Sequence, residues 1–320
     1  MTAPVKTFTL NDGNVIPAFG LGTWKSPKGE VRAAVKAALQ VGYTHIDAAW
    51  IYQNEQAVGQ GIHDAIDGGA IAREEMFITS KLWNTFHRPE AVEKGCRETL
   101  AALGVEYLDL YLMHWPIAFR PDTPDHKAPE DFIPLSELPL SKTFEAMLKL
   151  RDRGLVKSVG VSNCSISTLK QIIAESGAVP AVNQVELHPY NPQNELLDYC
   201  QDQGIRLTAY SPLGSGDRPE SMKQKDEPPL LENEAVKAIA QKEGLSTAQL
   251  LIAWAIDRGT VVIPKSTNAE RIAENLAAAT HSLSGEARSA LDEIDIQYRY
   301  VSPSSWFFPG ITFEGEDFWR

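Results

Sequence analysis

The stretch SVGVSNCSISTLKQIIAESGAVPAVNQVELHPYNPQNELLDYCQDQGIRLTAY, residues 158–210, decides the fold. It contains three short apolar runs, Ser158–Val161, Val182–Glu186 and Arg206–Tyr210, whose first residues are 24 positions apart. Longer amphipathic segments separate these runs. Apolar strands that alternate with helical segments are typical of a parallel sheet covered by helices.

The same alternation extends over most of the chain. Residues Val31, Ala34, Val35 and Ala38 share one helical face, as do the apolar residues of 92–103. Helix ends are predicted at Gly42, Gly104, Gly154 and Gly204. We predict eight strands, at Ala18–Leu21, Thr44–Asp47, Met76–Lys81, Tyr107–His114, Ser158–Val161, Val182–Glu186, Arg206–Tyr210 and Thr260–Ile263.

Eight strand–helix units in about 250 residues predict an α/β fold of the (β/α)8 TIM-barrel type, with the active site at the carboxyl ends of the strands. A doubly wound dinucleotide fold is the competing interpretation. Its GxGxxG motif is absent after the first strand, because Gly20-Leu21-Gly22 is followed by Thr23-Trp24-Lys25.

The remaining segments fit one domain spanning residues 1–320. An Asn-Asp-Gly turn predicts an N-terminal hairpin at about residues 7–17. Long loops at 117–139 and 212–232 follow the fourth and seventh strands, so both would overhang the active-site face. The tail, at about residues 296–320, is rich in aromatic residues, so we expect it to pack on another part of the protein and to contribute a substrate loop.

Composition excludes several classes of protein. The 320 residues are 43% hydrophobic and 22% charged, as in ordinary globular proteins, and the net charge of −12 argues against binding nucleic acid or an anionic membrane. Cys96, Cys164 and Cys200 form no CxxC pair, so neither a disulfide framework nor a metal site is expected. Residues 1–10 lack the apolar core of a signal peptide, and no run is long enough to span a membrane. A cytoplasmic protein is therefore predicted.

Polar residues at the ends of apolar strands indicate chemistry. Asp47, Lys81 and His114 end three successive strands, and Tyr52 lies five residues after Asp47. Neighbouring parallel strands are about 4.8 Å apart, so the four side chains are expected to converge. A tyrosine hydroxyl can donate a proton at neutral pH if a cation such as Lys81 lowers its pKa, while Asp47 holds Lys81 and His114 orients a carbonyl oxygen. The alternative is an ordinary ion pair at the barrel rim with a core histidine and a surface tyrosine.

A second group of residues predicts a phosphate site. The eighth strand runs into Lys265 and Ser266, and a predicted helix carrying Arg271 follows. A helix N-terminus with two nearby cations suits a phosphate monoester, as expected for the last loops of a barrel. The alternative is an ordinary helix cap with surface charges.

These residues resemble the aldo-keto reductase superfamily from about Leu10 to Asn275. The resemblance rests on GLGTW (20–24), DAAWIY (47–52), SKLW (80–83), LMHWP (112–116), GVSN (160–163), NQVE (183–186), YSPLG (210–214) and IPKS (263–266).

The resemblance implies a catalytic tetrad of Asp47, Tyr52, Lys81 and His114, with Tyr52 as general acid, and NADPH as the cofactor. It implies cofactor binding by Gly22, Thr23, Trp24, Asp47, Ser162, Asn163, Gln184, Tyr210, Ser211, Leu213, Ser215, Asp217, Lys265, Ser266, Thr267, Arg271, Glu274 and Asn275. It also implies a substrate pocket formed by Trp24, Trp50, Tyr52, Trp83, His114, Trp115, Phe119 and Trp306.

The sequence thus predicts a monomeric, NADPH-dependent reductase of aldehydes and some ketones, reversible as an alcohol dehydrogenase. One alternative is a nucleotide-binding regulatory subunit with little turnover, a role known in the same superfamily. Another is a barrel hydrolase that uses Asp47 and Glu186, which the predicted phosphate site and the neighbouring Lys81 disfavour.

Overall fold

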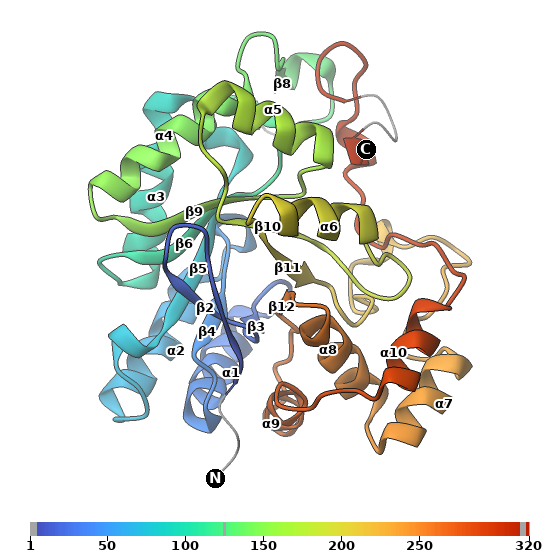
Figure 1. The fold of residues 1–320 in the computed structure, drawn as a ribbon. Coiled ribbons are helices and arrows are strands. Elements are labelled where there is room, and N and C mark those ends of the chain that lie inside the picture. Colours follow the sequence, from blue (N-terminus) through green and yellow to red (C-terminus); the bar gives the residue numbers. More distant parts are fainter. Residues whose placement is uncertain (1–4, 124–125, 314–317, 320) are drawn as a thin grey trace.

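Eight parallel strands curl around a central axis, with helices on the outside (Figure 1). The computed structural model describes residues 5–123, 126–313 and 318–319. Within these residues the strands are β3 (Leu21–Gly22), β4 (His45–Asp47), β5 (Phe77–Leu82), β6 (Leu108–Met113), β9 (Val156–Ser162), β10 (Val182–Glu186), β11 (Arg206–Tyr210) and β12 (Val261–Val262), hydrogen-bonded in that order.

Hydrogen bonds between the first and last strand regions close the barrel. The Gly20 N–H donates to the Val262 oxygen over 2.9 Å, and the Val262 N–H donates to the Ala18 oxygen over 2.9 Å. The prediction of a (β/α)8 barrel is therefore confirmed. The first strand was predicted at Ala18–Leu21 but is β3, Leu21–Gly22, because Phe19 forms only an isolated bridge with Val262 and the Ala18 N–H donates to the Lys6 oxygen. The last strand, β12, is likewise shorter than predicted.

An N-terminal hairpin covers the amino end of the barrel. It consists of β1 (Thr7–Thr9) and β2 (Val15–Pro17), close to the predicted bounds. The Asn14 side chain donates to the Ser158 hydroxyl over 3.0 Å, and Arg206 lies over the Phe8 ring, so the hairpin contacts residues at the beginnings of β9 and β11. Ligands are therefore expected at the opposite, carboxyl end of the strands.

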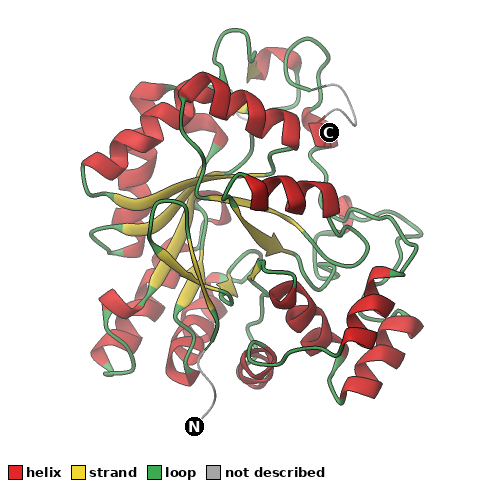
Figure 2. Ribbon diagram, in the orientation of Figure 1, coloured by secondary structure: helices red, strands yellow, loops and turns green. Residues whose placement is uncertain are grey.

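Ten α-helices occur in the described part of the chain, and most of them surround the barrel (Figure 2). They are α1 (Lys28–Val41), α2 (Glu55–Asp67), α3 (Pro89–Leu103), α4 (Leu140–Asp152), α5 (Ile166–Ser176), α6 (Asn194–Asp202), α7 (Glu234–Glu243), α8 (Thr247–Asp257), α9 (Ala269–Ala278) and α10 (Gly285–Asp292). Gly42 and Gly104 end α1 and α3 in the left-handed conformation, as predicted. Helices α7 and α10 lie side by side as additions to the eightfold pattern.

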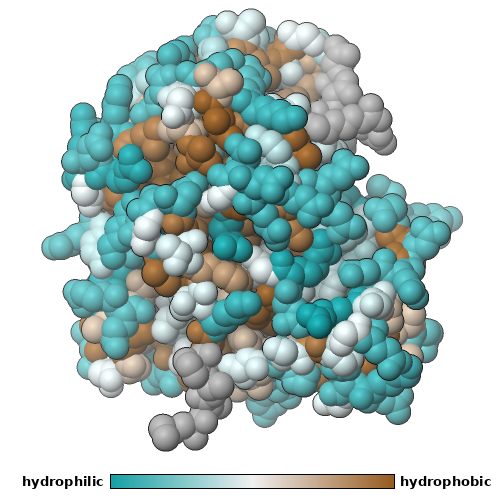
Figure 3. All heavy atoms as spheres, viewed as in Figure 1, coloured by the Kyte–Doolittle hydropathy of each residue, from teal (hydrophilic) through white to brown (hydrophobic). Residues whose placement is uncertain are grey.

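The outer helices pack closely because two positions in α2 have no side chain. A Cβ atom on Gly59 would lie 2.3 Å from the Leu103 oxygen of α3, and one on Gly61 would lie 2.6 Å from the Arg32 oxygen of α1. Hydrophilic residues dominate the outer surface in Figure 3, with apolar side chains visible between the helices. No helix within the described residues is both long enough and apolar enough to cross a membrane.

Three irregular segments extend the carboxyl end of the barrel. The loop after β6 contains a small hairpin, β7 (Ala118–Phe119) with β8 (Phe132–Ile133), which the sequence did not predict. The β11 loop, residues 211–233, contains a 3-10 turn at Glu220–Met222. The tail packs on another part of the chain, as predicted. Its partner is the loop after β6, since the Trp306 ring lies 5.0 Å from that of Phe119. Residues 314–317 and 320 of the tail lie outside the described residues.

Candidate active site

Four polar side chains meet at the carboxyl ends of β4, β5 and β6. Asp47 ends β4, Lys81 lies near the end of β5, His114 follows β6, and Tyr52 ends a 3-10 turn after β4. Lys81 Nζ donates to Asp47 Oδ1 over 2.6 Å and lies 3.5 Å from the Tyr52 hydroxyl oxygen. The Tyr52 and His114 ring centres are 5.9 Å apart. The structure therefore brings all four predicted catalytic side chains together.

The Asp47–Lys81 ion pair is buried and fully hydrogen-bonded. Lys81 is only 1% exposed, and its ammonium also donates to the Ala48 oxygen over 2.9 Å. The second Asp47 oxygen accepts a hydrogen bond from Gln184 Nε2 over 2.8 Å. Burial lowers the pKa of Lys81, and Asp47 opposes this effect. Such a pair is tolerated in the interior because each charge has its partners.

The predicted lowering of the Tyr52 pKa is wrong. Burial raises the pKa of Tyr52 well above its ordinary value, and the negative charge of Asp47 raises it further. The positive charge of Lys81 is largely compensated by Asp47, with which it forms its shortest contact. The Tyr52 hydroxyl therefore stays protonated at neutral pH, which is the form that can donate a proton.

His114 is neutral in this environment. Burial lowers its pKa well below the ordinary value, and the charge of Lys81 and the nearby His87 lower it further. Trp83 and Trp115 pack against the imidazole, with ring centres 5.3 and 6.4 Å away. A neutral imidazole has one N–H donor, which suits it to orient an oxygen acceptor rather than to carry charge.

One cavity of about 930 Å³ extends from Asp47, Tyr52 and His114 across the mouth of the barrel, whereas Lys81 does not line it. Every residue predicted to bind the cofactor lines it, including Gly22, Thr23, Ser162, Leu213, Thr267, Glu274 and Asn275. Of the predicted substrate residues, Trp24, Tyr52, Trp83, His114, Trp115 and Trp306 line it as well. No group of three or more His, Cys, Asp or Glu side chains that could hold a metal ion occurs in the parts of the chain that the structure describes.

Trp50 and Phe119, also predicted to form the substrate pocket, do not line the cavity. The 3-10 turn directs the Trp50 indole outward, where its N–H donates to Glu98 over 3.0 Å and its ring packs on Phe86. Phe119 lies behind the wall and contacts Trp83 and Trp306 through its ring. Phe119 therefore supports cavity-lining residues, whereas Trp50 belongs to the packing of α3.

Polar side chains at the ends of β9, β10 and β11 orient one another on one wall of the cavity. The Tyr210 hydroxyl donates to Asn163 Oδ1 over 2.8 Å, and Asn163 Nδ2 donates to the His114 backbone oxygen over 2.9 Å. The Ser162 hydroxyl donates to the Gln184 backbone oxygen over 2.7 Å. This wall is thus connected to the Asp47–Lys81 pair through Gln184, which bonds Asp47.

The far end of the cavity has the features of an anion site. Lys265, Ser266 and Arg271 line it, next to the beginning of α9, where Asn268 caps the Arg271 N–H over 2.9 Å. The N-terminus of a helix and two cationic side chains together favour a bound phosphate.

An ion-pair cluster crosses the mouth of the cavity, and sequence reasoning found only part of it. Asp217, in the β11 loop, accepts hydrogen bonds from Lys265 over 2.7 Å and from Lys25, which also donates to the Ser215 hydroxyl. Burial alone would raise the Asp217 pKa, but Lys25 and Lys265 outweigh it and lower this pKa to about 2. Lys25 was not predicted. Its position directly after Trp24, which was predicted to bind the cofactor, was the only sequence signal for its role.

Four non-glycine residues around the cavity have left-handed backbone conformations. Lys25 and Asn163 have φ of 60°, Ser211 has φ of 48° and Ser215 has φ of 49°. Such conformations are uncommon outside glycine and concentrate at functional sites.

Glu55 is a buried carboxyl behind the catalytic group that the sequence did not reveal. It begins α2, and its Oε1 accepts a hydrogen bond from the Ser80 hydroxyl over 2.6 Å. Burial raises its pKa to about 7. Ser80 and Lys81 point to opposite faces of β5, so Glu55 contacts the strand from the outside.

The Glu186 carboxylate binds the tail. Its two carboxylate oxygens accept the Tyr300 and Val301 backbone N–H groups over 2.7 Å each, and His188 bonds one of them over 2.9 Å. Because Glu186 anchors the tail and Asp47 is paired with Lys81, the hydrolase alternative has no free carboxylate pair here.

Comparisons with known proteins agree with this geometry. The model of the Aldo/keto reductase family matches residues 18–296. The chain belongs to the aldo/keto reductase family. An aldo/keto reductase of Synechocystis sp. is 46% identical over 315 residues, covering 98% of this chain and 96% of that protein. The Rattus norvegicus protein named aldo-keto reductase family 1 member A1 is 46% identical over 92% of this chain and 90% of its own length.

A solved structure extends the family relationship to three dimensions. The Bombyx mori aldo-keto reductase, crystallised in complex with NADP, superposes with a TM-score of 0.85 at 38% identity. It covers 95% of this chain, and this chain covers 97% of it. The predicted family and fold are both confirmed.

Proposed function

We propose that this aldo/keto reductase uses NADPH to reduce aldehydes, and some ketones, to alcohols, with Tyr52 as the general acid. The observation that carries the proposal is the single cavity that joins Asp47, Tyr52 and His114 to the Lys265–Arg271 anion site. A proton donor without a nucleophile or metal ligands suits reduction of a carbonyl, which needs an external hydride.

The residues present fit NADP(H). The cavity volume of about 930 Å³ is at the upper end for ligand sites, with room for an extended dinucleotide beside a substrate. Ser162, Asn163 and Gln184 offer amide and hydroxyl groups for the carboxamide, and Tyr210 offers a ring for stacking. Ser211, Leu213, Ser215 and Asp217 lie in the loop that would cover the pyrophosphate. Lys265, Ser266 and Arg271 would hold the 2′-phosphate, with Glu274 and Asn275 near the adenine.

The chain's own residues would manage the proton. When bound, NADPH supplies a hydride to the carbonyl carbon. The protonated Tyr52 hydroxyl donates its proton to the carbonyl oxygen, and the resulting phenolate is left beside the Lys81 ammonium, 3.5 Å away. Neutral His114 donates a hydrogen bond that orients the oxygen, and the Trp24, Trp83, Trp115 and Trp306 walls exclude water. Alcohol oxidation reverses these steps.

In the alternative of a regulatory subunit, the protein binds the nucleotide but reduces little or no substrate. The hydrogen-bonded Asp47–Lys81 pair next to a protonated tyrosine favours catalysis, because it places a cation 3.5 Å from the oxygen that would carry negative charge after proton transfer. Oxidation of NADPH in the presence of 4-nitrobenzaldehyde, followed by its absorbance, tests the choice. Tryptophan fluorescence quenching by NADPH is measured in parallel. Binding with turnover supports the reductase, binding without turnover supports the regulatory subunit, and no binding refutes both.

We further propose that residues 1–320 form one barrel domain that acts as a monomer in the cytoplasm. The family match across 18–296 and the packing of the tail on the loop after β6 support the first part. Size-exclusion chromatography with light scattering tests the monomer; a stable dimer mass would contradict it.

A further inference from the structure

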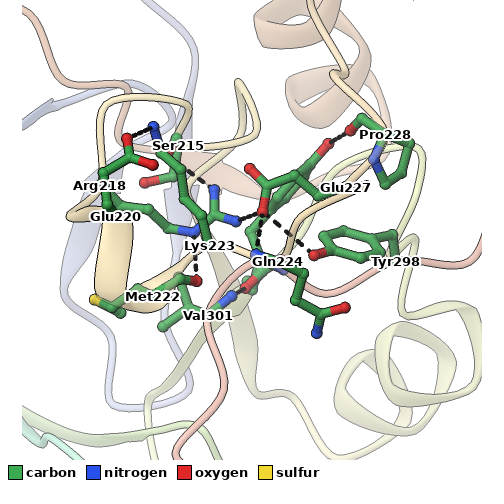
Figure 4. A network of polar contacts seen from close by, with 12 residues as sticks. Ser215, Arg218, Glu220, Met222, Lys223, Gln224, Glu227, Pro228, Tyr298 and Val301 are labelled. Carbon is green, nitrogen blue, oxygen red and sulfur yellow. Dashed lines mark hydrogen bonds and ion pairs between the residues drawn. The ribbon is translucent and has the colours of Figure 1, made fainter.

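The β11 loop is attached to the rest of the protein in two ways. On its cavity side, Asp217 reaches Lys25 and Lys265. The next residue, Arg218, points into the interior of the loop, and Figure 4 shows the network that it forms. The adjacent residues Asp217 and Arg218 therefore form two separate attachments of the loop. Asp217 attaches it at the cavity mouth, and Arg218 attaches it beneath the loop.

Arg218 is buried at the centre of this network. Its side chain is 0% exposed. The guanidinium donates to the Ser215 oxygen over 3.2 Å, to the Met222 oxygen over 3.2 Å and to the Glu227 carboxylate, and it lies over the Tyr300 ring. A guanidinium has five donors in a fixed plane, so one side chain sets the positions of three loop segments.

Glu227 connects the loop to the tail. The oxygen that pairs with Arg218 also accepts the Gln224 backbone N–H over 3.2 Å and the Tyr298 hydroxyl over 3.3 Å (Figure 4). The tail is itself fixed to β10, because the Tyr300 and Val301 N–H groups donate to Glu186. The base of the β11 loop is thus connected, through Arg218, Glu227 and the tail, to the barrel.

The two attachments differ in how easily they break. The Asp217 side chain is 52% exposed, and ion pairs of exposed groups contribute little free energy because solvent screens them. Breaking the buried Arg218–Glu227 pair leaves an uncompensated charge, which costs far more. Opening the mouth therefore separates Asp217 from its lysines while the Arg218 network stays formed. The left-handed residues Ser211, Gly214 and Ser215 precede both attachments in the loop.

We propose that Arg218 is a positioning residue for the cofactor. By fixing the Ser215 backbone and the start of the loop, it places Ser215 and Asp217 where they bond Lys25 and Lys265. The mouth then stays closed over a bound nucleotide, and Arg218 sets the rate of nucleotide release without touching the nucleotide. The inference rests on the cofactor site of the proposed function.

The test compares the full-length protein with Arg218→Met by stopped-flow tryptophan fluorescence. We expect NADPH to dissociate at least about tenfold faster from the variant, since charged hydrogen bonds are lost, with a matching rise in Kd. The single-turnover rate of aldehyde reduction at saturating NADPH should be unchanged, because the catalytic side chains keep their contacts. Arg218→Lys, which keeps the charge but cannot reach both backbone oxygens, should give an intermediate release rate.

Two milder variants and one control complete the experiment. Glu227→Gln and Tyr298→Phe each weaken the network and should speed release by smaller factors, and they carry the test if Arg218→Met does not fold. Arg88→Met removes an exposed arginine that pairs with Glu137, and it should leave release unchanged. Unchanged release in the folded network variants, or an equal fall in the single-turnover rate, would overturn the inference. Failure of the unmodified protein to bind NADPH would refute the proposed function instead.

Discussion

The two ends of the cavity are built in opposite ways. At the catalytic end, Asp47 and Lys81 lie on barrel strands, are almost fully buried and have their partners within the barrel. At the mouth, Asp217 lies on a loop and pairs with Lys25 and Lys265 in partial contact with solvent. Strands hold the Asp47–Lys81 pair at a fixed distance, whereas a loop whose Asp217 carboxylate is half exposed can open. The difference shows how one cavity combines fixed chemistry with exchange of a large cofactor.

The largest expected effect tests the catalytic end. Tyr52→Phe removes only the hydroxyl, so turnover of an aldehyde should fall by about 10²–10⁴-fold, the usual contribution of a general acid. NADPH binding should stay unchanged, because the anion site is at the other end. Steady-state rates and fluorescence titration measure the two quantities. Substantial residual turnover would show that another group supplies the proton.

The next effect tests the anion site, which lies beyond the mouth at the beginning of α9. Arg271→Ala should weaken NADPH binding by about 10- to 100-fold, since hydrogen bonds to charged groups are among the strongest. NADH lacks the 2′-phosphate and should bind as before, and kcat should change little. Lys242→Ala, which removes an exposed cation paired with Glu286, serves as the control. Equal losses for NADPH and NADH would argue against a 2′-phosphate site at Arg271.

These two experiments concern residues that could be identified from the sequence alone. They could be identified because the periodic pattern of apolar strands and helices shows where each strand ends. Asp47, Lys81 and His114 stand out because each ends an apolar strand, and the ends of parallel strands meet. Lys25 and Asp217 are 192 residues apart, and their pairing depends on the path of an irregular loop, which no periodicity encodes. Glu55 was missed because it contacts β5 from the outside. Trp50 was misplaced because a 3-10 turn, invisible in the spacing, directs it away from the cavity.

A third experiment measures how burial of the Glu55 carboxyl changes the free energy of unfolding with pH. The pKa of Glu55 is raised to about 7, so the folded protein keeps a proton that the unfolded chain releases near pH 4.5. This group therefore stabilises the fold less as pH rises from about 4.5 to 7. The free energy of unfolding of Glu55→Gln should therefore rise by on the order of 1–3 kcal/mol relative to that of the unmodified protein across this pH range. Above the range the difference should stay constant. Urea unfolding at several pH values measures this difference.

An exposed carboxyl provides the control for that experiment. Glu30→Gln, on the outer face of α1, should show no such pH-dependent difference. A constant difference between Glu55→Gln and the unmodified protein at all pH values would mean that Glu55 is ionised in the fold throughout, and that the catalytic end is wetter than its burial indicates.

The smallest effect separates the cavity wall from the packing behind it. Trp306→Leu should raise KM for an aromatic aldehyde by about 3- to 10-fold, because it removes an aromatic contact from the wall. Trp50→Leu should change KM by less than about twofold, since its indole faces α3. KM values for benzaldehyde derivatives measure both. A larger effect of Trp50→Leu would place Trp50 in contact with the substrate.

The left-handed residues Lys25, Asn163, Ser211 and Ser215 bear on engineering. Each conformation costs a non-glycine residue about 1 kcal/mol or more, and glycine would relieve it. Glycine at these positions would also remove the Lys25, Asn163 and Ser215 side chains, whose hydrogen bonds join the segments around the cavity, so the gain in backbone conformation would be offset by lost contacts. The mouth of the barrel thus limits how far Tm can be raised without loss of the cofactor.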